Sequence, residues 1–199
     1  WLWDFDARPL EEDDRRDPGL ERQGRTGFSG TLYKTDRFLR AHPFGNVPAA
    51  FDGTGSVGIF ESNSIMRAVA RLANDDRGVY GRDPYQASRI DSFLDASLVF
   101  ARDTQHYLLC LGSDRLTREL HTQGRDAFTN YLGGIERAMA TGGGFIAGEE
   151  LTLADICFVA ELSLFSRERA WRRTIEAIEC EPIDWSGFEY ATAHYEELC

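Results

Sequence analysis

Two residue pairs, separated by one short hairpin, carry groups that could hold a small peptide. Val47-Pro48 stands at the entrance to an apolar run, and Glu61-Ser62 stands where a helix is expected to begin. If the chain bends sharply at Val47-Pro48, the Val47 N–H and C=O face outward, and an extended peptide can pair with them like an added strand. This bend is easiest with a cis bond, which proline alone makes accessible at low cost.

The second pair adds a charged end to this edge. A helix that starts near Ser62 has N–H groups without intrahelical partners, and its dipole favours an anion there. Ser62 can add a hydroxyl donor, and Glu61 can face an ammonium group. The ligand so described has a carboxylate and an amine at one end and a peptide-like middle, and glutathione fits this description.

Each pair also has a purely structural explanation. A Val-Pro before a strand is commonly a turn or a sheet edge, and a Glu-Ser before a helix is commonly a cap. The two pairs at this spacing, joined by one hairpin, are more specific than either alone. The elements that position them are a turn at Asp52-Gly53, a strand over Val57–Phe60 and a helix over Ser62–Leu72.

The runs N-V-P-A and F-E-S-N-S-I resemble the glutathione-binding half of the glutathione S-transferase family. The resemblance implies that Val47 and Pro48 hold the cysteinyl backbone and that Glu61 and Ser62 hold the γ-glutamyl end. Asn46 stands where the family often places a polar side chain, and we favour it for the glycine carboxylate over the cations of Lys34, Arg37 and Arg40, since surface Lys and Arg usually face solvent.

The phrase F-L-R-A-H-P-F-G-N-V-P-A-A-F is also similar to the gamma subunit of the eukaryotic translation elongation factor complex, which uses the same fold with little established need for catalysis. The resemblance to the transferase fold implies an α/β plus all-α chain. We expect a truncated thioredoxin-like domain over residues 1–75 and an all-helical domain over residues 83–199, with the linker in the turn-rich segment 73–82.

The beginning of the chain departs from the family pattern. Trp1–Phe5 is predicted as a strand that corresponds to the second strand of the family, so the first strand and helix are not represented. In the family, the Ser, Tyr or Cys that handles the glutathione sulfur normally lies in that part, and the catalytic residue is therefore unassigned. Residues 6–31 are expected to form a long solvated loop, with a lid as the alternative. Either this sequence lacks the beginning of the protein or the protein departs from the family, and Cys199, at the end of a helical pattern, is a second point where the chain can be cut.

The second half shows helical spacing almost throughout. Pro84 is a good first helical residue, and helices are predicted over Pro84–Leu111 and Leu116–Met139, antiparallel to each other. In the run L-T-L-A-D-I, Thr152 and Asp155 have the spacing of a capping box. The same pattern starts the central helix in the transferase family, so both residues are expected to be structural. Shorter helices are predicted over 170–178 and 185–198; Tyr33–Ala41 is expected to form another in the first half.

Composition excludes several classes of partner. The 199 residues carry a net charge of −11, which argues against nucleic acid and against an anionic membrane surface. The four cysteines form no C-x-x-C pair, and no cluster with histidine has zinc spacing, so no metal is expected. Reduced cysteines and the absence of a signal-peptide pattern favour a cytoplasmic protein.

Two hypotheses for function follow from the resemblance. In the first, the protein is an enzyme that transfers glutathione to a small hydrophobic electrophile bound between the domains, with Phe100, Thr104 and Tyr107 in the pocket wall. Residues of this kind on a helix are otherwise simply core. In the second, the same fold serves as a non-catalytic binding or assembly module. The resemblance also implies a homodimer.

Overall fold

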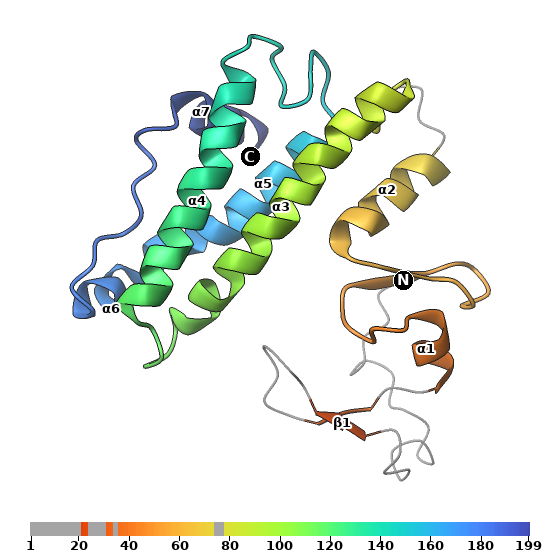
Figure 1. Ribbon diagram of the computed structural model, residues 1–199, viewed down its shortest axis with the longest axis horizontal. Helices are drawn as coiled ribbons and strands as arrows, with labels where there is room; N and C mark the ends of the chain where they lie inside the picture. Colours follow the sequence, from red (N-terminus) through yellow and green to blue (C-terminus); the bar gives the residue numbers. More distant parts are fainter. Residues whose placement is uncertain (1–20, 24–30, 34–35, 74–77) are drawn as a thin grey trace. The chain divides into compact units, whose positions relative to one another are not determined.

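The computed structural model describes residues 21–23, 31–33, 36–73 and 78–199. The chain divides into two compact units, Trp1–Val69 and Ala70–Cys199. This division falls inside helix α2 (Ser62–Leu72), slightly before the linker expected from sequence over residues 73–82. Figure 1 gives the course of the chain.

The first unit contains two small antiparallel sheets and two helices in its described residues. One sheet pairs β1 (Glu21–Gln23) with β2 (Thr31–Tyr33), and the other pairs β3 (Ala49–Phe51) with β4 (Gly58–Phe60). Helix α1 (Asp36–Ala41) lies between the two sheets in sequence, and α2 follows β4 after a single residue.

Two expectations for the first unit were wrong. The segment 6–31 was predicted to be a loop, but Glu21–Gln23 within it is a strand whose residue Glu21 pairs with Tyr33. The helix predicted to start at Tyr33 begins instead at Asp36, because Tyr33 belongs to β2. The strand predicted over Trp1–Phe5 lies outside the described residues.

The turn between β3 and β4 is organised by one carboxylate. Asp52 accepts hydrogen bonds from the backbone N–H groups of Thr54, Ser56 and Val57 at 3.3, 2.8 and 2.8 Å, and from the Thr54 hydroxyl at 2.6 Å. These bonds lower the pKa of Asp52 to about 2, with the Thr54 hydroxyl as the largest cause and the Val57 N–H as the next. An Asp at this position therefore fixes the hairpin geometry.

The second unit is helical. Its elements are α3 (Pro84–Cys110), α4 (Arg118–Met139), α5 (Leu153–Ser166), a short 3₁₀ helix (Arg167–Trp171), α6 (Arg172–Ala177) and α7 (Glu189–Leu198). Figure 1 shows α3 and α4 running antiparallel, as predicted; α5 packs against α3, and α7 packs against both α4 and α5. Asp83 and Thr117 cap α3 and α4 by accepting backbone hydrogen bonds, which explains where both helices begin.

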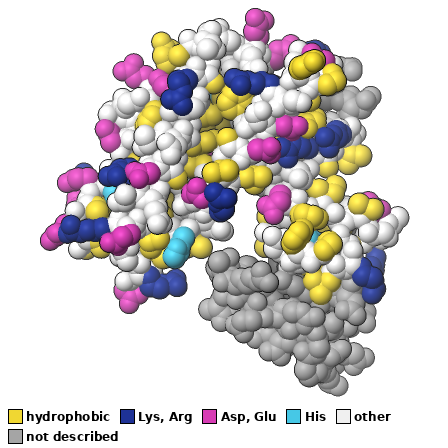
Figure 2. All heavy atoms as spheres, in the orientation of Figure 1, with side chains coloured by type: hydrophobic (Ala, Val, Ile, Leu, Met, Phe, Trp, Pro, Cys, Tyr) yellow, Lys and Arg dark blue, Asp and Glu magenta, His cyan; other side chains and the backbone are white. Residues whose placement is uncertain are grey.

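The core of the second unit is aromatic. Phe128 is fully buried, and its ring lies 4.7 Å from that of Phe165 and 5.1 Å from that of Trp185. Figure 2 shows hydrophobic side chains gathered along the seam where α3 meets α4, with charged side chains around it. Such burial supplies the main stabilisation of a helical unit.

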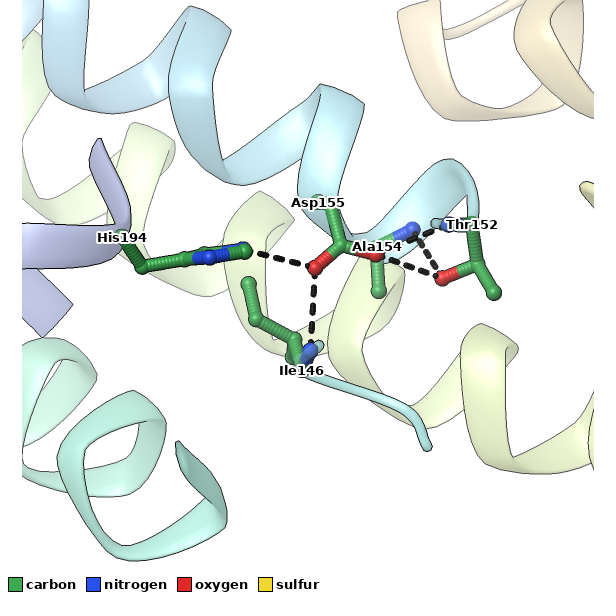
Figure 3. Close-up of polar contacts among 5 residues, drawn as sticks. All are labelled: Ile146, Thr152, Ala154, Asp155 and His194. Carbon is green, nitrogen blue, oxygen red and sulfur yellow. Dashed lines mark hydrogen bonds and ion pairs between the residues drawn. The ribbon is translucent and has the colours of Figure 1, made fainter. Parts of the chain in front are cut away.

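The expected capping box starts α5 (Figure 3). The Thr152 hydroxyl accepts from the Ala154 N–H, and the Asp155 carboxylate accepts from the Thr152 N–H at 2.8 Å. Asp155 also accepts from the Ile146 N–H and from Nε2 of His194, each at 2.9 Å, and is fully buried. One carboxylate thus joins the start of α5, the loop before it and the final helix.

Candidate functional site

The register of the β3–β4 hairpin brings the two candidate pairs together. Ala49 pairs with Phe60, and the strands are antiparallel. Pro48, which precedes Ala49, and Glu61, which follows Phe60, are therefore at the same end of the hairpin. The four residues Val47, Pro48, Glu61 and Ser62 are all exposed at this end.

Val47-Pro48 forms a cis peptide bond. The Val47 side chain is 48% exposed, and within the described residues no hydrogen bond engages the Val47 backbone. Its N–H and C=O can therefore pair with the backbone of an extended ligand.

Glu61 connects β4 to α2 with an unusual backbone conformation. Its φ is +66°, in the left-handed region that residues other than glycine rarely adopt. The Glu61 C=O accepts the N–H of Ile65 at 3.0 Å and so closes the first turn of α2. Backbone strain of this kind costs on the order of 1–3 kcal/mol and is concentrated at functional sites.

Ser62 is the first residue of α2, as the sequence predicted. No hydrogen bond to its hydroxyl is found among the residues that the structure describes. The hydroxyl lies at a helix N-terminus, where backbone N–H groups and the helix dipole favour a carboxylate. Among the residues described, Ser62 therefore has a hydroxyl donor without a partner, and it has a favourable electrostatic position.

The sequence offers four candidates for the glycine carboxylate of glutathione: Asn46, Lys34, Arg37 and Arg40. Asn46 is exposed and adjoins Val47. Arg37 is engaged elsewhere, because its Nη2 donates to the Thr54 carbonyl at 3.1 Å. Arg40 is exposed in the last turn of α1, and Lys34 lies outside the described residues.

His42 was not predicted to take part in the site. Its side chain is fully buried, and its Nε2 lies 2.8 Å from the carbonyl oxygen of Asn46, directly beside the Val47 edge. The sequence holds one indication of this contact, because a glycine, Gly45, stands between His42 and Asn46 and allows the chain to turn back. In the structure Gly45 has a φ of +59°, which glycine adopts readily.

Phe100, Thr104 and Tyr107 lie in α3 with exposed fractions of 3%, 1% and 1%. The Phe100 ring stacks 4.6 Å from that of Tyr131, and the Thr104 hydroxyl donates to the Phe100 carbonyl. The Tyr107 hydroxyl donates to Oε1 of Glu168 at 3.0 Å, and burial is the main cause that raises the pKa of Tyr107. Within the second unit these side chains pack the helical core.

Two further observations concern other classes of site. Across the described residues, no group of three or more His, Cys, Asp or Glu side chains is placed to hold a metal ion. No helix in the described part of the chain is both long enough and apolar enough to cross a membrane.

Solved structures with a similar fold include glutathione transferases. Glutathione transferase F2 from Populus trichocarpa is 23% identical, with a TM-score of 0.64 over 82% of this chain and 74% of that one. A delta-class glutathione transferase from Nilaparvata lugens is 25% identical, with a TM-score of 0.58 over 82% of this chain and 69% of that one. The chain therefore has the glutathione S-transferase fold, with a thioredoxin-like part and a helical part.

Within this fold, the sequence is similar to elongation factor 1-gamma. It is 31% identical to elongation factor 1-gamma-A of Xenopus laevis over 134 residues, and this alignment covers 67% of this chain and 29% of that protein. It is 29% identical over 160 residues to a probable elongation factor 1-gamma 1 of Arabidopsis thaliana, covering 79% of this chain and 38% of that one. The match thus spans well under half the length of these relatives. No protein-family model matches the chain.

Proposed function

We propose that this chain binds glutathione through the end of the β3–β4 hairpin. The Val47 backbone pairs with the cysteinyl part of the ligand beside Pro48, and the γ-glutamyl carboxylate is held by Ser62 and the start of α2. Glu61 faces the ligand's ammonium group, and Asn46 takes the glycine carboxylate. The observation that carries the proposal is the register of the hairpin, since Ala49 opposite Phe60 puts both pairs at one end.

The reaction proposed is transfer of glutathione to a small hydrophobic electrophile. Binding would favour the thiolate, which is the reactive form of the cysteinyl sulfur. The transferase fold supports this class of function, and the strained backbone at Glu61 supports a functional role for the hairpin end.

Retention on immobilised glutathione tests the binding site. Ser62→Ala removes one donor to a charged group, worth about 1.5–3 kcal/mol, so retention should be lost. Ser64→Ala is the matched control, because Ser64 lies in the same helix two residues further on and should leave retention unchanged. Equal retention of wild-type and Ser62→Ala protein would contradict the assignment of Ser62.

A second function is a non-catalytic binding or assembly module. The similarity to elongation factor 1-gamma supports this alternative. Turnover of an aryl halide with glutathione separates the two: retention together with turnover favours the transferase, and retention without turnover favours the module.

A further inference from the structure

His42 is a fully buried residue of the first unit. The residue directly follows α1, and its backbone N–H donates to the Phe38 carbonyl at 2.8 Å. Its ring lies 4.7 Å from that of Phe60 at an interplanar angle of 5°, and 5.4 Å from that of Phe38. The ring therefore contacts two aromatic side chains.

The hydrogen bond of this ring has a defined direction. A carbonyl oxygen only accepts, so Nε2 of His42 must carry the proton that it shares with the Asn46 carbonyl, 2.8 Å away. Nδ1 is buried and has no hydrogen-bond partner among the described residues. Among the described residues, the imidazole therefore makes one hydrogen bond, to the Asn46 carbonyl.

This contact determines where the Val47 N–H points. In a planar trans peptide, the carbonyl oxygen and the N–H lie on opposite sides of the C–N bond. Only Val47-Pro48 is cis among the described residues, so the Asn46–Val47 peptide is trans. Because His42 draws the Asn46 carbonyl towards the buried ring, the Val47 N–H is directed away from it.

The same ring contacts the other half of the site. Phe60, on which it stacks, immediately precedes Glu61 and Ser62. One buried side chain therefore contacts the peptide group before Val47 and the strand that leads into α2.

We propose that His42 is a positioning residue for glutathione binding: its Nε2–H fixes the Asn46–Val47 peptide, and its ring fixes the spacing between that peptide and Glu61-Ser62. This role rests on the proposed function and extends it to a residue that would not touch the ligand. The hydrogen bond sets the orientation of the Asn46–Val47 peptide, and the stacking on Phe60 sets the distance between that peptide and Glu61-Ser62.

Two substitutions distinguish these contributions. His42→Phe keeps an aromatic ring against Phe60 but removes the donor. His42→Gln loses the ring but places an amide N–H2 where it can reach the Asn46 carbonyl. With loss of one hydrogen bond in the first variant, we expect glutathione affinity to fall about tenfold. In the second, affinity should recover to within about threefold of wild type.

The measurements are calorimetric titration with glutathione and nuclear magnetic resonance of the free proteins. The Asn46 carbonyl ¹³C shift and the Val47 amide shift should change in His42→Phe and return towards wild type in His42→Gln. Thermal unfolding of each variant shows whether it is folded, and the resonance shifts report the peptide orientation without ligand.

Two outcomes would overturn the role of His42 alone. One is wild-type affinity in His42→Phe, and the other is equal loss in both variants, which would indicate a general packing effect. A wild-type protein that binds no glutathione would overturn the proposed function and this role together.

Discussion

Nε2 of His194, in the last helix, lies 2.9 Å from Oδ1 of Asp155, in the first turn of α5, and both side chains are buried. The two residues come from elements far apart in sequence. Asp155 already accepts from Thr152 and Ile146, so His194 completes a carboxylate surrounded by donors. The contact therefore anchors α7 to the start of α5.

Removing the His194 donor should destabilise the second unit. His194→Phe keeps a ring beside Phe158, whose centroid is 6.1 Å from that of His194, but leaves Asp155 with one partner fewer. A hydrogen bond to a charged group contributes about 1.5–3 kcal/mol, and we expect a loss of that size. Urea unfolding followed by circular dichroism measures it. His194→Gln, which retains a donor, is the control; equal losses in the two variants would contradict the assignment.

The Thr152 cap should contribute a smaller amount. Thr152→Ala removes the acceptor for the Ala154 N–H and the hydroxyl donor to Asp155, and should cost about 1 kcal/mol. Thr152→Ser keeps the hydroxyl and should cost clearly less. The same unfolding measurement applies, and an unchanged midpoint for Thr152→Ala would show that the cap contributes nothing.

Two glycines of α4 should respond to the same substitution in opposite directions. A Cβ at Gly124 would lie 2.6 Å from Cδ1 of the buried Tyr107, whereas one at Gly134 would have no atom of the structure's described part within 4 Å. Gly124→Ala should therefore destabilise by about 1–3 kcal/mol through overpacking. Gly134→Ala should stabilise by about 0.5–1 kcal/mol through helix propensity. Thermal unfolding of both variants checks the pair, and a stabilising Gly124→Ala would contradict the packing.

Local patterns predicted much of this structure. The Val47-Pro48 edge, the start of α2 at Ser62 and the capping box of Thr152 and Asp155 depend on residues within a few positions of one another. Local backbone preferences and short-range hydrogen bonds fix such features, so the sequence carries them directly.

Contacts between distant segments could not be predicted in the same way. His194 was not assigned to Asp155, because nothing near either residue specifies a partner in another helix. The strand Glu21–Gln23 was missed because its partner residues, not its own pattern, make it a strand. The burial of Tyr107 likewise depends on how α3 and α4 pack, which helical spacing alone does not determine.

The Asp52 turn should lose stability in acid. Its hydrogen bonds lower the pKa to about 2 from the ordinary value of 3.8. Since the folded-state pKa is the lower one, the stabilisation is fully present above pH 3.8 and is lost as the pH falls towards about 2. Following the Asp52 carboxyl ¹³C resonance against pH should give a midpoint near 2, and Asp52→Asn should remove this part of the acid destabilisation. A midpoint near 3.8 would contradict the observed bonds.

The packing of β4 against the end of α1 should control glutathione binding. A Cβ at Gly58 would lie 2.3 Å from the Ala41 carbonyl oxygen and 3.3 Å from Cβ of His42. Gly58→Ala must therefore move β4 and the chain that carries His42 apart, and so shift the Asn46–Val47 peptide relative to Glu61-Ser62. We expect loss of retention on immobilised glutathione, together with about 1–3 kcal/mol of destabilisation.

The matched control for this last change is Gly53→Ala, in the turn of the same hairpin, where an added Cβ meets none of the described atoms within 4 Å. It should retain both stability and glutathione binding. Because Gly58 touches no proposed ligand group, its effect reaches the ligand through the positions of two segments: β4, which leads into Glu61-Ser62, and the end of α1 with His42. A folded Gly58→Ala protein that binds glutathione as tightly as wild type would show that the hairpin end forms its site without that support.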